Sequence, residues 1–292
     1  MFICNQCPRK CNIDRDLTFG VCGVGSAYRV ARAALHYWEE PCISGEKGSG
    51  TVFFSGCGLK CVYCQNYKVS AECFGKEITE DRLIEIFKEL EDRGANNINL
   101  VSPSHYSVQL AETLSKYKPS IPVVYNTGGY DSVESLRLLD GLVDIYLTDI
   151  KYVSPSVSQK YSKAADYFEV CSAAVKEMRR QQEKDVFENG LMKKGMIIRH
   201  LVLPGNVSQG MKMLDWVKDN LSTDTYISLM RQYVPYGKAK EMPPIDRRLT
   251  SREYAIAKQR ILALGFENCY FQGKDAAEEI FIPDFGLQGV DL

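Results

Sequence analysis

The stretch TVFFSGCGLKCVYCQN (51–66) joins a short apolar run to a loop that carries three cysteines. Residues 51–56 are rich in β-branched and aromatic side chains, which is typical of a parallel strand buried on both faces. Cys57, Cys61 and Cys64 follow in a Cys-x3-Cys-x2-Cys pattern. A structural zinc site needs four ligands, and no histidine or cysteine follows Cys64 closely enough to complete a local set. Three thiolates on one loop can instead hold three irons of a four-iron cubane and leave the last iron open to a small molecule.

The rest of the chain repeats this change from strand to helix. Near-continuous apolar runs predict strands at 51–56, 97–101, 121–126, 144–149, 196–203 and 225–230. Amphipathic patterns predict helices at 79–94, 105–117, 131–140, 157–182, 207–220 and 250–264. Repeated βα units imply an α/β fold with parallel strands and right-handed crossovers. Such units either lie open in a doubly wound sheet or close in part, and we predict a partial (β/α)6 TIM-like barrel. In both arrangements ligands bind at the carboxyl ends of the strands.

The first fifty residues differ in composition from the rest. They are rich in cysteine, glycine and arginine, and they have only a short apolar pattern at 27–37. We predict a small cysteine-rich metal-binding module over 1–50 and a core barrel with a C-terminal extension over 51–292. Within the core, the segment 183–195 predicts a polar hairpin or a surface insertion, and 236–248 predicts a basic, proline-containing loop beside the ligand-binding edge.

Charge and cysteine usage limit the classes of partner and compartment. The 292-residue chain has a formal net charge of -1 with both signs mixed, which points to no nucleic acid and no membrane as partner. The N-terminus lacks a basic start followed by an apolar segment, and no run of about 18 apolar residues occurs. We expect a soluble, cytoplasmic protein. Most of its 11 cysteines lie in two tight clusters, which in a reducing compartment indicates metal binding rather than disulfides.

The three-cysteine loop resembles the CxxxCxxC motif of the radical S-adenosylmethionine (SAM) superfamily, in which an aromatic residue precedes the last cysteine, as Tyr63 does here. The resemblance implies that Cys57, Cys61 and Cys64 hold a [4Fe-4S] cluster whose open iron is chelated by SAM. In that family, one-electron reduction of SAM yields methionine and a 5'-deoxyadenosyl radical that abstracts hydrogen from the substrate. The protein sets geometry, potential and water exclusion. A flavodoxin- or ferredoxin-type electron donor is implied as well.

The resemblance extends over nearly the whole chain and narrows to the pyruvate formate-lyase activating enzymes and their PflX-like relatives. TDIK (148–151) matches an Asp-x-Lys element of activating enzymes. This implies that Asp149 belongs to a small cation site near the methionyl carboxylate and that Lys151 helps to hold the same end. IIRHLVLPG (197–205) matches their RxxVxPG element and makes Arg199 a candidate partner of the ribose or carboxylate. The alternatives are a helix cap or solvated charge for Asp149 and a structural salt bridge for Arg199.

Further candidate cofactor-binding side chains lie in the loop or near strand ends: Tyr63, Asn66, Ser102, Ser104, Asn126 and Gln232. Ser102 and Ser104 stand in VSPSHY, where many superfamily members have Gly-Gly-Glu-Pro, so hydroxyls replace the carboxylate that holds the methionyl amino group. Gln232 stands about where activating enzymes have a histidine near the adenosyl group. Asn126 opens NTGGY, which is alternatively an ordinary tight turn. Asn66 belongs to CQN, a form shared by PflX-like and AmmeMemoRadiSam enzymes, whereas glycyl-radical activases usually have His-Asn.

His105 is the candidate catalytic residue, because it follows the second predicted strand and opens onto the ligand-binding edge. It is one of 3 histidines in the chain. A hydrogen-bonded structural role is the alternative for any such lone histidine.

A second set of cysteines lies near the N-terminus, at Cys4, Cys7, Cys11 and Cys22. Four thiolates complete a zinc site or a second iron-sulfur cluster equally well, and spacing does not choose between them. The CPRxC and GxCG elements also resemble the PflX-like and AmmeMemoRadiSam patterns. The alternative is a set of thiols without metal.

The combined reading is a radical SAM oxidoreductase that resembles glycyl-radical activases, with a glycyl-radical enzyme as its partner. One alternative is a radical SAM enzyme that transforms a small-molecule metabolite. The other is a non-enzymatic metal-binding interaction protein.

Overall fold

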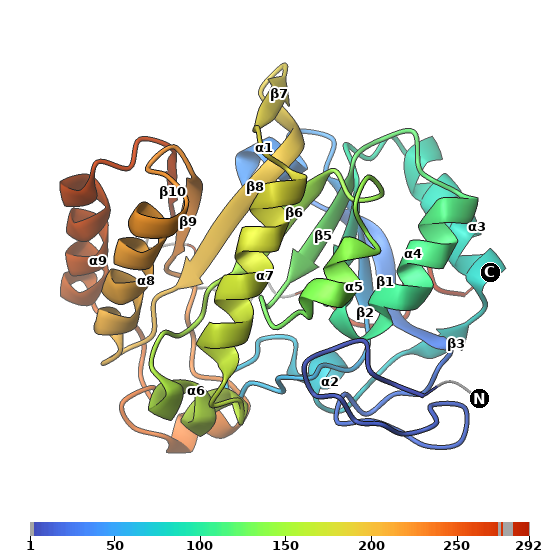
Figure 1. Ribbon diagram of the computed structural model, residues 1–292, viewed down its shortest axis with the longest axis horizontal. Coiled ribbons are helices and arrows are strands. Elements are labelled where there is room, and N and C mark those ends of the chain that lie inside the picture. The colour runs from blue at the N-terminus through green and yellow to red at the C-terminus, as the bar shows by residue number, and fades with distance from the viewer. Residues whose placement is uncertain (1–2, 274–275, 277–282, 292) are drawn as a thin grey trace.

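The computed structural model describes residues 3–273, 276 and 283–291 and places its strands in a mostly parallel sheet, with the longer helices along one face (Figure 1). The strands are β1 (Tyr28–His36), β2 (Ser49–Phe54), β3 (Lys76–Ile78), β4 (Ile98–Val101), β5 (Val123–Thr127), β6 (Ile145–Asp149), β7 (Val186–Glu188), β8 (Leu191–Leu201), β9 (Tyr226–Met230) and β10 (Cys269–Phe271). The helices are α1 (Pro41–Ser44), α2 (Tyr67–Ser70), α3 (Glu80–Asp92), α4 (Ser107–Lys116), α5 (Val133–Arg137), α6 (Pro155–Ser162), α7 (Tyr167–Gln181), α8 (Val207–Asn220) and α9 (Ser251–Leu264), with 3-10 turns η1 (Ser104–Tyr106) and η2 (Gly237–Glu241).

The sheet order is β10-β9-β8-β6-β5-β4-β2-β1-β3, and β7 pairs with β8 outside this path. All pairings from β2 to β10 along the path are parallel, whereas β1 and β3 are antiparallel additions at one edge. The prediction of an α/β fold with a parallel sheet is confirmed. Within the described residues, β10 and β3 form two separate edges, so the sheet remains open.

The predicted strands all form, because each is an apolar run that the sheet buries on both faces. The hairpin predicted over 183–195 is made by β7 and the start of β8, where Val186 pairs with Lys194. The single helix predicted over 157–182 was wrong, because two helices form there. Lys163 has a left-handed backbone (φ 50) and caps α6, which ends the helix before α7 begins.

The segment 1–50 supplies part of the sheet as well as the cysteine-rich loops. Strand β1 pairs antiparallel with β2, with Ala34 opposite Thr51. The chain then turns into α1, whose Cys42 and Ile43 pack in one apolar cluster with side chains of β5, β6 and β8. In Figure 1, α1 lies at the end of the sheet opposite to the loops at the strand carboxyl ends. Residues 37–44 therefore approach the sheet from the amino-terminal ends of its parallel strands.

Candidate functional site

A cavity of ≈ 470 Å³ lies against the carboxyl ends of the parallel strands. Its lining includes nearly all the site residues predicted from the sequence: Cys7, Cys57, Cys61, Tyr63, Cys64, Asn66, Ser102, Ser104, His105, Asn126, Asp149, Lys151, Arg199 and Gln232. The volume falls in the range of about 300–1,000 Å³ that is common for small-molecule and cofactor sites. The structure therefore gathers side chains from six strand ends and the cysteine loop around one space.

The cysteine loop leaves β2 through a turn that requires glycine. Gly56 has a φ of +86°, and a Cβ placed there would lie 2.8 Å from the carbonyl oxygen of Cys22. The turn is also held from outside, because the Cys57 amide donates to the same Cys22 oxygen at 3.2 Å. The sequence SGC thus fixes where the first thiol enters the cavity.

The three cysteines of the loop line the same cavity. Burial raises the pKa of Cys61 to about 12, with Lys151 acting to lower it and the neighbouring Cys57 and Cys64 acting to raise it. Among the described residues, no group of three or more His, Cys, Asp or Glu side chains is gathered as a ligand set for one metal ion. A cubane places each thiolate on a different iron, so its ligands need not share one coordination sphere. The chemistry of this donor set therefore fits a [4Fe-4S] cluster.

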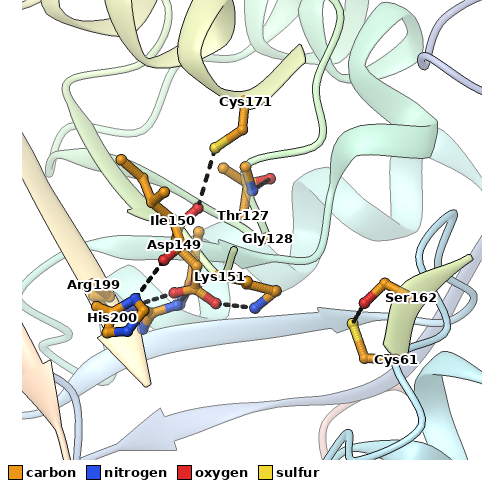
Figure 2. Close-up of polar contacts among 12 residues, drawn as sticks. Cys61, Thr127, Gly128, Asp149, Ile150, Lys151, Ser162, Cys171, Arg199 and His200 are labelled. Carbon is orange, nitrogen blue, oxygen red and sulfur yellow. Dashed lines mark hydrogen bonds and ion pairs between the residues drawn. The ribbon is translucent and has the colours of Figure 1, made fainter. Parts of the chain in front are cut away.

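A buried chain of hydroxyls supports the loop from behind. Tyr152 donates to the Tyr63 hydroxyl at 2.6 Å and shares a 2.8 Å hydrogen bond with Ser162. The Ser162 hydroxyl in turn lies 2.9 Å from Cys61 Sγ, as Figure 2 shows. Tyr63 packs edge-on against the rings of Tyr152 and Tyr161. The aromatic residue before the last motif cysteine is thus a buried wedge that positions the loop.

A network of charges forms the opposite wall (Figure 2). Asp149 accepts from Arg199 Nε at 2.9 Å and from the Lys151 ammonium group. Arg199 Nη2 also donates to Asn126 Oδ1 at 2.6 Å. Burial acts to raise the pKa of Asp149, but the charges of Lys151 and Arg199 outweigh it and hold the pKa below its ordinary value. Asp149 is therefore an ionised carboxylate in a buried ion network, and neither a helix cap nor a solvated charge.

Glu39 belongs to this network, and the sequence analysis missed it. Its Oε2 lies 3.1 Å from Arg199 Nη1, and its Oε1 accepts from the side-chain amides of Asn99 and Asn126, each at 3.1 Å. Glu39 stands in the segment after β1, which reaches this network from the amino-terminal ends of the parallel strands. We had expected ligands only at the carboxyl ends. The signal in the sequence was the pair of acidic residues in WEEP, between a strand pattern and an apolar turn.

The predicted serines border a smaller polar cluster. The Ser104 hydroxyl lies 3.1 Å from the Thr127 hydroxyl, and Thr127 donates to Asp131 at 2.5 Å. Ser102 has a left-handed backbone with φ 58 and donates its amide to the Asn126 carbonyl at 2.8 Å. Burial raises the pKa of Asp131, which also accepts from Tyr125. This cluster holds the strand ends and leaves the Ser102 hydroxyl at the cavity.

His105 touches the cavity wall but is only 2% exposed. Its Nε2 donates to the Ser55 carbonyl at 2.8 Å, so the ring ties η1 to the start of the cysteine loop. Burial and the charge of Arg15 lower its pKa to about 3. A neutral, hydrogen-bonded ring of this kind has the geometry of a structural histidine.

Gln232 and the residues after Cys64 meet at the open side of the cavity. Gln65 Nε2 donates to the Gln232 carbonyl at 2.9 Å, and Gln272 Nε2 donates to Gln232 Oε1 at 2.8 Å. Asn66 lies at the start of α2, where its backbone carbonyl accepts hydrogen bonds from the amides of Val69 and Ser70. Its side chain makes no capping hydrogen bond to the helix. The amide side chains of this strand end are thus held by one another.

The N-terminal cysteines lie next to the loop. Burial raises the pKa of Cys7 to about 12, with further contributions from the nearby thiols of Cys4, Cys22 and Cys11. Cys7 lines the main cavity. Arg9 fastens the segment to the cysteine loop, because its Nε donates to the Gly58 carbonyl at 2.8 Å. The four thiols are close enough to interact, although the described residues show no single-ion arrangement there.

Comparison with known proteins identifies a family and a fold. The family model described as the Radical SAM superfamily matches residues 51–205. The chain is 34% identical over 262 residues to the uncharacterized protein MJ0674 of Methanocaldococcus jannaschii, covering 86% of this chain and 71% of that protein. Among solved structures, Streptococcus suis SuiB bound to the precursor peptide SuiA matches with a TM-score of 0.52 and 12% identity, over 75% of this chain and 47% of SuiB. SuiB bound to S-adenosylmethionine matches with a TM-score of 0.50 at 12% identity, over 75% of this chain and 49% of SuiB. The chain thus spans about half the length of SuiB, and the likeness shows the fold.

No helix of the described residues has both the length and the apolar character that a membrane span requires.

Proposed function

Since the chain belongs to the radical SAM superfamily, we propose that it binds a [4Fe-4S] cluster through Cys57, Cys61 and Cys64 and cleaves SAM reductively. Membership implies an enzyme, so the alternative of a non-enzymatic metal-binding protein is set aside. The observation that carries the proposal is that these three thiols and the Asp149–Arg199 network line the same cavity.

The cluster and SAM would supply one electron and the 5'-deoxyadenosyl radical that abstracts hydrogen. Lys151 and Arg199 would hold the carboxylate or ribose of SAM, because their charges reach the cavity and are fixed by Asp149. Asn126, Ser102 and Gln232 would offer further hydrogen bonds. Tyr63 would keep water from the back of the loop, since its ring is only 6% exposed.

Single alanine variants test the ligand set. Cys57→Ala, Cys61→Ala and Cys64→Ala should each lose most of the four-iron optical signature after anaerobic reconstitution, because a three-iron attachment becomes a two-iron attachment. Cys269→Ala is the control, since Cys269 lies on β10 and outside the cavity lining. If the three loop variants kept the iron content and spectrum of Cys269→Ala, the ligand assignment would be wrong.

We propose an activase-like role for the substrate step, similar to that of PflX-like proteins, with a flavodoxin- or ferredoxin-type electron donor. The resemblance of TDIK and RHLVLPG to elements of the activating enzymes supports it. SuiB, whose fold is similar, is itself described with a precursor peptide. Incubation with SAM, a reductant and a candidate glycyl-radical enzyme should then produce a doublet radical signal in the EPR spectrum.

A small-molecule substrate remains the second candidate, because CQN replaces the His-Asn of activases and VSPSHY lacks their carboxylate. In that case the EPR doublet would be absent, and deuterium from a labelled metabolite pool would appear in 5'-deoxyadenosine. The two outcomes separate the classes.

We also propose that Cys4, Cys7, Cys11 and Cys22 hold zinc or a second iron-sulfur cluster. Their mutual electrostatic influence and the attachment of Arg9 to the cysteine loop support a common site. Metal analysis of a variant with Cys57→Ala, Cys61→Ala and Cys64→Ala combined tests this, because the loop then has no thiolate and the metal that remains belongs to the second set. A protein with neither zinc nor iron in this variant would contradict the proposal.

A further inference from the structure

A second cavity of ≈ 230 Å³ adjoins the main one. The two share Trp38, Glu39, Arg199, Met230, Gln232 and Gln272 as lining residues. Beyond these, the second cavity is lined by Glu40, Pro41, Ser228, Tyr270 and Phe271. It extends along β8, β9 and β10 from the proposed SAM site toward the segment after β1, and the SAM-binding residues proposed above do not use most of it.

Glu40 is the unusual residue of this cavity. Glu40 is only 8% exposed, and its Oε2 has no hydrogen-bond partner within the described residues. A buried carboxylate oxygen without a partner is costly unless a donor reaches it. Burial raises the pKa of Glu40, and the charge of Arg199 and the hydroxyl of Ser228 only partly oppose this. An occupant that brings a donor and a positive charge would remove the cost.

The charge of Arg199 acts on Glu40, but the hydrogen bonds of Arg199 within the described residues go to other side chains. Its Nε lies 2.9 Å from Asp149 and its Nη1 lies 3.1 Å from Glu39. Lys151 is likewise paired with Asp149. The carboxylates that line the two cavities are Glu39, Glu40 and Asp149, whereas the cations are Lys151 and Arg199. The combined site therefore carries one carboxylate more than it has cations.

The remaining wall is aromatic. Trp38, Tyr270 and Phe271 all line the second cavity. Aromatic faces attract ammonium and guanidinium groups, most strongly for tryptophan. A buried carboxylate oxygen without a hydrogen-bond partner, in a cavity that aromatic rings also line, favours an organic cation over an anion.

We propose that the second cavity binds an ammonium or guanidinium group of the substrate, with Glu40 as its counter-ion and Trp38 as an aromatic contact. This deepens the proposed function, on which it rests, by giving the substrate a chemical class. The cationic group would anchor the substrate beside the cavity that is proposed to hold SAM, so that a carbon near the amine faces it.

Probe binding to the reconstituted protein tests this without any turnover. The probes are n-butylammonium chloride and its uncharged counterpart 1-butanol, and affinity is measured by ligand-observed NMR titration. We expect the ammonium probe to bind at least about tenfold more tightly than the alcohol, since a hydrogen bond to a charged group contributes about 1.5–3 kcal/mol. If the wild-type protein bound the two probes with equal affinity, that result would be enough to overturn the proposal.

Substitutions then locate the site. Glu40→Gln should remove the preference for the ammonium probe, while Glu40→Asp should keep part of it. Glu46→Gln is the matched control, because Glu46 lies in the same segment but is exposed. An unchanged preference in Glu40→Gln would contradict the assignment. If the protein preferred the ammonium probe but did not cleave SAM, only the proposed function would be contradicted. If it cleaved SAM but showed no preference for the ammonium probe, only this inference would be contradicted.

Discussion

The Nη1 atom of Arg199 lies 3.1 Å from Oε2 of Glu39. This ion pair joins strand β8 to the segment between β1 and β2. Both side chains are largely buried, with exposed fractions of 13% and 10%. Arg199→Met should lower the free energy of unfolding by about 3–5 kcal/mol, because it leaves the largely buried carboxylate of Glu39 without its cation.

Adding Glu39→Gln to Arg199→Met should recover part of that loss, because the double variant buries one negative charge fewer. Urea unfolding of the wild type, both single variants and the double variant gives the coupling free energy. Strictly additive effects would show that the pair is not energetically linked.

The hydroxyl chain behind the cysteine loop predicts a smaller effect. Tyr152→Phe removes the contacts to Tyr63 and Ser162, and should cost about 1–3 kcal/mol because two buried groups lose a partner. The reconstituted variant should also release iron faster on exposure to a chelator. Tyr161→Phe is the control, a buried ring of the same cluster. Equal iron-release rates in the two variants would argue against positioning of the loop by Tyr152.

His105 predicts how stability depends on pH. Burial and Arg15 lower its pKa from 6.5 to about 3, so the unfolded chain binds this proton more readily than the folded one. The contribution to stability is present above about pH 6.5 and is lost as pH falls from there toward 3. The wild type should therefore lose stability more steeply over this window than His105→Gln. Parallel curves of unfolding free energy for the two proteins would contradict this assignment.

Helix α9 offers a prediction far from the cofactor chemistry. Thr250 and Glu253 form a reciprocal capping box at its start. Thr250→Ala should lower the free energy of unfolding by about 1 kcal/mol, because backbone donors at the helix start lose their acceptor. Iron content after reconstitution should stay at the wild-type value. A loss of iron in this variant would show that α9 acts on the site.

Most of the fold was predictable because each parallel strand is a buried apolar run between amphipathic helices. The candidate residues at strand ends were found for the same reason, since Asn126, Asp149 and Arg199 each sit where a buried strand stops or nears its end. Parallel pairing brings such ends together, so their meeting in one cavity needed no contact information.

Glu39 and Glu40 were not predictable in this way. They follow β1, whose antiparallel pairing with β2 sends the chain to the opposite end of the sheet. Their position at the second cavity depends on the packing of α1 against β5, β6 and β8, which is a tertiary contact. The break between α6 and α7 was also missed, because Lys163 adopts a left-handed conformation that ordinary propensity assigns to glycine or asparagine.

Release of 5'-deoxyadenosine tests the central claim most directly. The anaerobically reconstituted protein is mixed with SAM and a strong reductant, and the nucleoside is quantified by chromatography. We predict release by the wild type and none above background by Cys61→Ala, since the loop then lacks one of its three thiolates. A wild-type protein with a full complement of iron that releases no 5'-deoxyadenosine, or a Cys61→Ala protein that releases as much as the wild type, would contradict the account.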